Sequence, residues 1–409
     1  MRTRTISLCI IVFLLTMVLV SGCQSSTQQA QEIKIGAIFP FSGNMALLGE
    51  ENWRGAEIAR IVRNEKGGIG GKDITFLRAD APDATAAVAE ADRLITKEGV
   101  KVIIGTYSSS LAYAASEVAE RNGVIYWEVG GIADNITERG YKYLFRVCPT
   151  ASNFGINAAR FTANALAPKL GIAPQDLRVA VVYEDSLYGT TVAQYAEEEA
   201  KRIGLNVVAN EPYSSKSVDL SSVILNLKAA DPDVVIATSY APDSILLSRQ
   251  SKELGFRPKY LVGTGAGHAL RSFAETLGPD AEGVFNTDFT QIRTSSDYAV
   301  GIEEFVELYT KTFNEPPRSG HSLVSYHGAM VLFDVLEKAG SVDPEAIREA
   351  ALAIDQPDDQ SPTGYGAKFA GPDAKDAGQN QKAQTAVAQW QNGELITVWP
   401  EKAALASIK

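Results

Sequence analysis

The sequence predicts an α/β protein made of two Rossmann-like lobes that face each other. From residue 33 onwards, strand-like and helix-like patterns alternate with little interruption, which is typical of right-handed βαβ units around a parallel sheet. The stretch EGVKVIIGTYSSSL in the first half is echoed by DPDVVIATSYAPDS in the second. The chain has 409 residues, of which 45% are apolar, and this is enough to bury the cores of two such lobes.

The first half opens with an apolar run at 33–40, which predicts a strand, followed by apolar residues at helical spacing over 52–65. The glycine-rich stretch GGIGGK then predicts a turn. The remaining patterns of this half alternate in the same way. They predict strands at 73–79, 100–106 and 124–130, and helices at 83–99 and 109–122.

A second series of alternating patterns starts near residue 150 and again indicates βαβ units. It predicts helices at 153–171, 190–204, 219–231 and 244–255, and strands at 177–185, 205–213, 234–240 and 259–265.

The C-terminal part is less regular. Helical spacing predicts helices at 302–313, 322–340 and 342–354, and Asp343 is expected to be the N-cap of the last one. Two alternating runs joined through Asn392 and Gly393 predict a β-hairpin. Residues 356–382 are rich in Gln, Asp, Gly and Pro, and we expect a long loop with one short strand there.

The N-terminus has the pattern of an export signal. Two arginines precede an apolar stretch from Ile6 to Val20, which predicts a signal peptide over residues 1–22. The sequence LVSGC, which ends at Cys23, resembles a bacterial lipobox, and this implies cleavage before Cys23 and lipidation of its thiol. An ordinary signal peptide followed by a chance cysteine is the alternative. We expect residues 23–32 to be a lipidated tether that holds an exported protein at the cell membrane, on the periplasmic or extracellular face.

The composition argues against several classes of function. A formal charge of -11 without clustered Lys and Arg argues against a nucleic-acid partner. The chain lacks a GxSxG nucleophile elbow, and GGIGGK is followed by Asp73 where a P-loop needs Ser or Thr. His321 and His327 are six residues apart, so they do not share a helix face as a zinc-binding pair would. We therefore expect no catalysis, no metal and no cofactor.

The stretch IIGTYSSSLA leaves three roles for its serines: nucleophile, helix cap or clasp for a small ligand. The missing elbow argues against a nucleophile, whereas a cap and a clasp are compatible because a helix N-terminus offers free N–H donors. Ligands of open α/β sheets bind beyond the carboxyl ends of the strands. We therefore expect a small-molecule pocket lined by residues 41–44, 107–110, 129–131, 185–188, 240–243 and 263–268.

Six features carry a family resemblance: IKIGAIFPFSG, NWRGAEIA with NEKGGIGGK, ITERGYKYLFR, DSLYG, PDAEGVF and the final aromatic hairpin. Together with the lipobox they resemble the type I periplasmic binding proteins of the branched-chain amino acid (Leu/Ile/Val) ABC transporter family. The resemblance covers nearly all of residues 33–400. It implies crossovers near residues 148, 287 and 363 that join two lobes. Lobe 1 would hold 33–148 plus 288–362, and lobe 2 would hold 149–287 plus 363–409.

The resemblance also implies which residues hold the ligand. The carboxylate clasp of the amino acid binders falls on Ser108 and on the backbone near Ser109 and Gly130. Tyr188 and Tyr240 match positions that line the pocket from the second lobe. The expected ligand-binding residues are Trp53, Tyr107, Ser108, Ser109, Gly130, Gly131, Tyr188, Tyr240 and Gly265.

Three positions depart from the Leu/Ile/Val pattern. Leu48 replaces an aromatic hydroxyl, Ile132 replaces a ligand-holding Thr, and Gly265 replaces the Glu that receives the ligand's ammonium. A buried ammonium without an opposite charge costs several kcal/mol, so the sequence predicts weak or absent binding of leucine, isoleucine and valine. Three nearby carboxylates are candidates for the missing role: Glu128, Asp185 and Asp243.

The resemblance implies a substrate-binding protein of an ABC importer. It would capture a small carboxylate-bearing solute, either an amino acid or an organic or aromatic acid, by hinge closure, and present it to a permease in the cytoplasmic membrane. An alternative on the same fold is a sensor of amides or amino acids that signals to a partner. A third reading, an α/β enzyme, lacks a catalytic motif.

Overall fold

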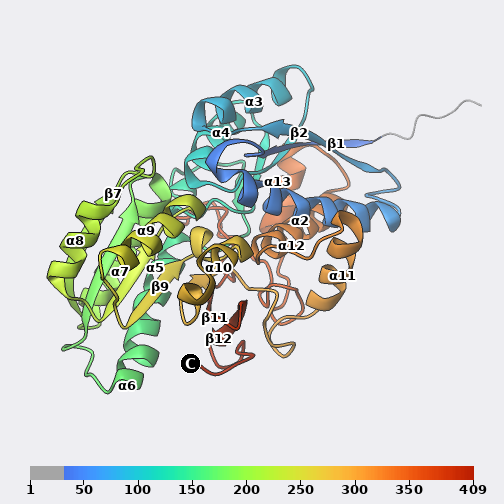
Figure 1. Cartoon of the computed structure of the whole chain (residues 1–409). Helices are drawn as coiled ribbons and strands as arrows, with labels where there is room; N and C mark the ends of the chain where they lie inside the picture. The colour runs from blue at the N-terminus through green and yellow to red at the C-terminus, as the bar shows by residue number, and fades with distance from the viewer. Residues whose placement is uncertain (1–31) are drawn as a thin grey trace, which may run out of the picture. The chain divides into compact units, whose positions relative to one another are not determined.

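The structure, a computed structural model that describes residues 32–409, is built on two sheets (Figure 1). The first sheet has the strand order β2-β1-β3-β4-β5 and is parallel throughout. Its strands are β1 (Ile33–Phe39), β2 (Ile74–Asp80), β3 (Val102–Gly105), β4 (Ile125–Glu128) and β5 (Leu144–Arg146). The predicted signal peptide, Cys23 and the tether as far as residue 31 lie outside the described residues.

The second sheet has the order β12-β11-β10-β9-β8-β6-β7. It is parallel from β7 to β10 and antiparallel from β10 to β12. Its strands are β6 (Arg178–Glu184), β7 (Asn206–Tyr213), β8 (Val234–Thr238), β9 (Tyr260–Thr264), β10 (Phe285–Asp288), β11 (Ala386–Gln391) and β12 (Glu394–Trp399). The predicted C-terminal hairpin is confirmed, because Asn392 and Gly393 turn the chain at φ 56° and 80°.

Helices accompany both sheets, as the alternating pattern predicts. The first sheet has α2 (Ala46–Glu65), α3 (Ala84–Thr96), α4 (Ser109–Arg121), α12 (His321–Ala339) and α13 (Pro344–Leu352), with α11 (Ile302–Phe313) against α2. The second sheet has α5 (Ala151–Phe161), α6 (Ala167–Leu170), α7 (Leu187–Arg202), α8 (Ser221–Ala230), α9 (Ala241–Glu253) and α10 (Arg271–Leu277). None of these described helices combines the length and the apolar character needed to cross a membrane.

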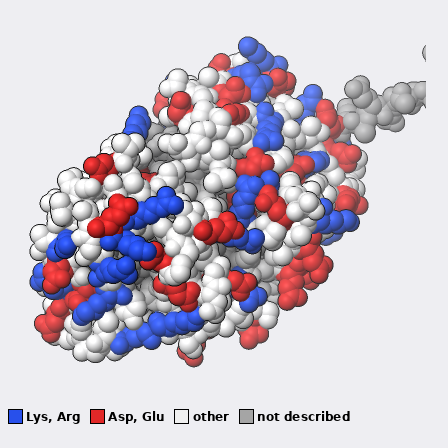
Figure 2. All heavy atoms as spheres, in the orientation of Figure 1, with Lys and Arg blue, Asp and Glu red and all other residues white. Residues whose placement is uncertain are grey.

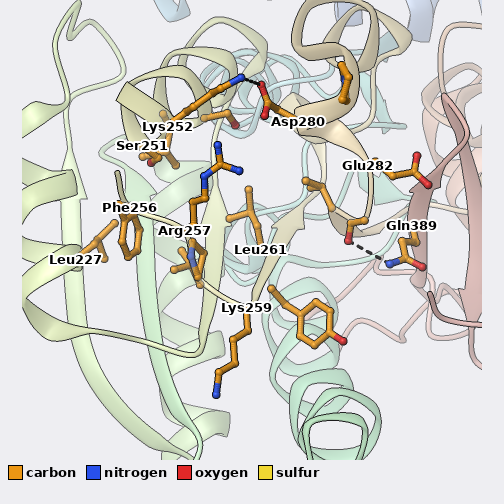
Figure 3. Close-up of a pocket in the computed structure, with 18 of the residues that line it drawn as sticks. Leu227, Ser251, Lys252, Phe256, Arg257, Lys259, Leu261, Asp280, Glu282 and Gln389 are labelled. Carbon is orange, nitrogen blue, oxygen red and sulfur yellow. Dashed lines mark hydrogen bonds and ion pairs between the residues drawn. The ribbon is translucent and has the colours of Figure 1, made fainter. Parts of the chain in front are cut away.

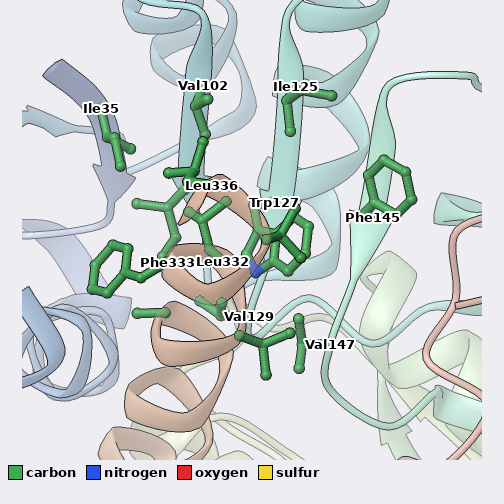
Figure 4. Close-up of a cluster of buried hydrophobic side chains, with 14 of the residues drawn as sticks. Ile35, Val102, Ile125, Trp127, Val129, Phe145, Val147, Leu332, Phe333 and Leu336 are labelled. Carbon is green, nitrogen blue, oxygen red and sulfur yellow. The ribbon is translucent and has the colours of Figure 1, made fainter. Parts of the chain in front are cut away.

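The core of the first sheet explains why α12, from the C-terminal part of the chain, packs on a sheet formed by the N-terminal part. Figure 4 shows Leu332, Phe333 and Leu336 of α12 facing strand residues such as Val102 and Trp127. The indole Nε1 of Trp127 also donates a hydrogen bond to the carbonyl oxygen of Gly328 at 2.8 Å. Burial of these side chains, at about 1.5–3 kcal/mol each, attaches α12 to the first sheet. The boundaries of the two lobes stay predictions.

The second sheet is buried on both faces, which is why its strands read as continuous apolar runs. On one face, Phe161 of α5 and Ala196 of α7 pack on Ile236 of β8 and its neighbours. On the other face, Ile224 of α8 and Leu247 of α9 cover the opposite side of the same strands. The predicted α/β class is therefore confirmed.

Several predicted elements differ from the structure. The helix predicted at 153–171 is interrupted, because a π-helical turn at Thr162–Leu166 separates α5 from α6. The short strand predicted within 356–382 does not form; this described loop has only isolated bridges that pair Gln379 with Arg146 and Asn380 with Phe369. The strands β5 and β10 and the helix α10 were not predicted. The runs LFR of β5 and FNTD of β10 hold two and one apolar residues, unlike the equally short VIIG of β3, and the seven residues of α10 make only two turns. Asp343 is the N-cap of α13, as predicted, and its side chain accepts from the backbone N–H of Glu345 and Ala346.

Candidate ligand-binding site

A small cavity lies where the carboxyl ends of strands from both sheets meet. Its volume is about 20 Å³, enough for roughly one water molecule. This is the place where open parallel sheets bind ligands. The lining residues are Tyr107, Ser108, Ser109, Gly130, Ile132, Phe154, Tyr188, Tyr240, Gly265, Ala266, Asp288, Phe289 and His321.

The serines after β3 have separate roles. Ser108 is the N-cap residue of α4, but its side chain makes no capping hydrogen bond, so the helix-cap role is not realised. Its hydroxyl oxygen instead lies 3.3 Å from the hydroxyl oxygen of Tyr240, which belongs to the second-sheet side of the cavity. The Ser109 hydroxyl accepts from the backbone N–H of Ile132 and Ala133, at 3.2 and 3.1 Å. Ser108 therefore faces the cavity, while Ser109 holds the neighbouring loop in place.

Aromatic rings form the walls of the cavity. The rings of Phe154 and Phe289 meet edge to face, with centroids 5.3 Å apart, and those of Tyr188 and Tyr240 are also 5.3 Å apart. Tyr188 donates its hydroxyl hydrogen to the carbonyl oxygen of Thr264. The hydroxyl of Tyr107 is buried and has no hydrogen-bond partner among the described residues. Within residues 32–409, Tyr107 thus leaves a polar group without a hydrogen-bond partner in the wall of the cavity.

Asp288, the last residue of β10, supplies the carboxylate of the site. It is fully buried, accepts from the backbone N–H of Phe289 at 2.7 Å, and accepts from the side-chain amide of Asn286 at 3.0 Å. Burial raises the pKa of Asp288 to about 8, because the charged form loses its hydration. Burial likewise lowers the pKa of His321 to about 3, so no positive imidazolium lies in this cavity at neutral pH.

Glu128, the last residue of β4, supports the loops that carry the clasp. Its carboxylate accepts from the backbone N–H of Thr106, Gly130 and Gly131, at 2.8, 2.8 and 2.6 Å. The backbone N–H of Val129 donates to the same group at 3.1 Å. The N–H of Gly130 is therefore already engaged. Gly130 is needed for close packing, since a Cβ there would lie 2.8 Å from the Cα of Tyr107.

The structure brings seven of the predicted ligand-binding residues to this cavity: Tyr107, Ser108, Ser109, Gly130, Tyr188, Tyr240 and Gly265. Gly131 and Trp53 do not line it. Gly131 contacts the Glu128 carboxylate, and Trp53 packs beside Phe41, with the guanidinium of Arg78 4.3 Å from its ring centroid. These two residues therefore act in packing around the first sheet.

None of the three carboxylates named as replacements for the missing Glu lines the cavity. Glu128 is occupied by backbone donors, as described above. Asp185 accepts from the backbone N–H of Ser215 at 3.1 Å, and Asp243 accepts from the Tyr213 hydroxyl at 2.6 Å. Leu48 is buried in the apolar cluster that surrounds Tyr107 and Ile132.

Sequence reasoning missed Phe154, Ala266, Asp288, Phe289 and His321, although Ala266 lies within the strand-end range 263–268. Asp288 ends the run VFNTD, which has two adjacent apolar residues and no alternation, so the sequence carries little signal for β10 and its carboxyl end. The sequence presents His321 only as a candidate metal ligand. In the structure its ring lies beside that of Tyr107, with centroids 5.8 Å apart. Phe154 lies inside a predicted helix, and it reaches the cavity only because the two halves of the chain pack against each other.

Comparison with known proteins shows the family of the chain. The family model of the periplasmic binding proteins matches residues 32–394. A Leu/Ile/Val-binding protein homolog 7 from Brucella suis biovar 1 is 44% identical over 379 residues, which cover 92% of this chain and 94% of the relative. The leucine-binding protein LivK from Thermotoga maritima aligns at TM-score 0.76 and 26% identity, over 89% of this chain and 97% of that one.

A solute-binding protein of an ABC transporter from R. palustris, solved in complex with benzoate, also has this fold. It aligns at TM-score 0.76 and 20% identity, over 92% of this chain and 98% of that one. Two lobes with a cavity at facing strand ends define the class of solute-binding proteins. The chain belongs to the periplasmic binding protein family.

Proposed function

We propose that this protein is the lipid-anchored substrate-binding component of an ABC importer and that it captures a small amino acid between its two lobes. The observation that carries the proposal is the pairing of Ser108 and Asp288 in one cavity, each supplied by a different sheet. The predicted lipobox at Cys23 supports the membrane anchor, and the family supports the role in transport.

The two ends of the site match the two charges of an amino acid. At one end, the Ser108 hydroxyl and the N-terminus of α4 offer donors to a carboxylate, and the helix dipole favours the negative charge there. At the other end, a ligand ammonium close to Asp288 would draw it into its ionised form, although burial favours the protonated form when Asp288 is alone. Asp288 thus provides the opposite charge that Gly265 lacks.

Ligand entry requires the lobes to separate. The cavity of about 20 Å³ is smaller than any amino acid, and the hydroxyl oxygens of Ser108 and Tyr240 in its lining are only 3.3 Å apart. A hinge opening that parts these two hydroxyls would expose the site, and closure around the ligand would form the shape that a permease recognises.

An aromatic monocarboxylate is the second candidate ligand, because rings of Phe154, Phe289 and Tyr188 line the cavity. A protonated Asp288 would donate a hydrogen bond to such an acid instead of receiving an ammonium. The two candidates differ in the protonation state of one residue, so they are experimentally separable.

A thermal-shift screen tests the proposal. The panel contains small α-amino acids, including leucine, isoleucine and valine, together with benzoates and aliphatic monocarboxylates. The sequence predicted weak binding of the three branched amino acids, because Gly265 stands where a Glu carboxylate is usual. They are included in the panel because Asp288 supplies a carboxylate in the structure. A true ligand at one hundred times its dissociation constant adds about 2.7 kcal/mol to the stability. Stabilisation by amino acids supports the proposal, stabilisation by benzoates alone supports the second candidate, and no stabilisation by either class contradicts both.

Replacing Ser108 with Ala is expected to weaken binding of the ligand found in this screen by about 1–3 kcal/mol, because the ligand's carboxylate loses one charge-assisted hydrogen bond. Isothermal titration calorimetry measures the change in dissociation constant. Ser110, two residues further along the chain in α4, does not line the cavity, so Ser110→Ala is the matched control and should bind as the wild type does. An unchanged affinity of Ser108→Ala would remove Ser108 from the site.

A further inference from the structure

A second and larger cavity lies at the other end of the second sheet. Its volume is about 410 Å³, within the range of small-molecule sites. Val235 and Leu261 lie near the starts of β8 and β9, and Val284 precedes β10. The cavity is therefore at the amino ends of the strands, whereas the candidate ligand-binding site is at their carboxyl ends.

The interior of this cavity is aliphatic. Leu261 is partly exposed in the floor, whereas Leu227 of α8 and Leu247 of α9 border the cavity and are almost fully buried. Phe256 closes the side beside Leu227, as Figure 3 shows. Such a surface accommodates a hydrocarbon chain, because removing apolar area from water favours binding.

The rim is basic on a protein whose formal charge is -11. Lys252, Arg257, Lys259 and Lys409 line the cavity together with Asp280 and Glu282. On the face drawn in Figure 2, Lys and Arg side chains gather over the region that Figure 1 labels α8, α9 and β9. A local excess of positive charge favours an anionic ligand here.

Ion pairs leave one of these four cations unpaired. Lys252 pairs with Asp280 at 2.6 Å, and Lys409 pairs with Glu282 at 2.9 Å. Lys259 pairs with Asp233 at 2.7 Å, and Figure 3 shows its side chain pointing away from Arg257. Within residues 32–409, Arg257 makes no ion pair, and Figure 3 shows its guanidinium directed toward Ser251 and Lys252 at the rim.

We propose that this cavity is a second binding site, which takes a small aliphatic monocarboxylate. The chain lies against the partly exposed apolar residues Pro258 and Leu261, and the carboxylate binds the guanidinium of Arg257. A guanidinium presents two parallel N–H donors to a carboxylate, so one free Arg matches one anionic group. This site is separate from the one between the lobes and does not depend on the function proposed above.

Calorimetric titration of the purified protein with octanoate tests the proposal. Octanoate should bind, and Arg257→Gln should weaken it about tenfold, because the charge-assisted hydrogen bonds are lost. The matched control is Lys259→Gln, which removes the same charge from a side chain that points away, and it should change the affinity less than about twofold. Octanol, which has the same chain without the charge, should bind the wild type and Arg257→Gln equally.

The variant Ser108→Ala separates the two sites. Octanoate bound at the second cavity should be unaffected by it, whereas octanoate bound between the lobes should be weakened. The proposal is overturned if octanoate does not bind the wild type, if Arg257→Gln binds it as tightly as the wild type, or if Ser108→Ala weakens it as much as Arg257→Gln does.

Discussion

Replacing Asp288 with Asn should weaken an amino acid ligand by about 2–5 kcal/mol, or at least thirtyfold, since the ligand's ammonium loses its buried counter-charge. Asn has nearly the same shape as Asp, so the change removes charge rather than packing. Titration calorimetry at pH 8 measures the loss. Asp185→Asn is the matched control, because Asp185 has the same charge but does not line the cavity, and its affinity should stay within about twofold of the wild type.

The pH dependence gives an independent test of the same role. Because the pKa of Asp288 is about 8 in the unliganded protein, the carboxyl is protonated below that value, and an ammonium must displace the proton. Affinity for an amino acid should therefore rise by up to about tenfold per pH unit until pH 8 and then level off. Asp288→Asn should show a flat profile. A ligand whose affinity falls as the pH rises through 8 would instead be an anion that binds the protonated carboxyl.

Replacing Glu128 with Ala should destabilise the protein by about 3–6 kcal/mol, because several buried backbone N–H groups lose their acceptor at once. These donors belong to the loops after β3 and β4, so the loss should also disorder the segment that carries Ser108. Urea unfolding monitored by circular dichroism measures the free energy of unfolding.

Glu128→Gln is the informative companion variant. Its side chain keeps one acceptor oxygen in nearly the same place, so a loss of about 1–2 kcal/mol is expected. If Glu128→Ala unfolds within about 1 kcal/mol of the wild type, the carboxylate does not hold these loops. If both variants are equally unstable, its charge matters more than its acceptor geometry.

Most of the fold could be predicted because long elements repeat their pattern. The strand β1 and the helix α11 follow the predicted limits closely, and the Asn392–Gly393 turn specifies its own hairpin. The strand β10 was missed, since its four residues include a single apolar residue and do not alternate. The break after α5 was missed because the alternative backbone of a π-helical turn has no clear sequence signal.

The residues of the candidate site that follow predicted strands could be predicted. The residues that reach the cavity only when the two halves of the chain pack together could not. Tyr107, Ser108 and Tyr240 follow strands that were recognised, so their convergence followed from the topology. Asp288 was not predicted, because the sequence has no clear signal for its strand, β10. Phe154 and His321 lie on helices, and only the assembled structure shows which helix faces meet the cavity.

The contact between Ser108 and Tyr240 affects how the Ser108 hydroxyl can bind a ligand. The hydroxyl proposed to receive the ligand's carboxylate is also the one that touches the opposite side when the two sheets' strand ends meet. A carboxylate that accepts the Ser108 hydrogen leaves the oxygen of Ser108 able to accept from the Tyr240 hydroxyl, so a bound ligand would fix the direction of this hydrogen bond. Binding and closure would then use the same hydroxyl, which links a residue of the second-sheet side to the ligand through Ser108.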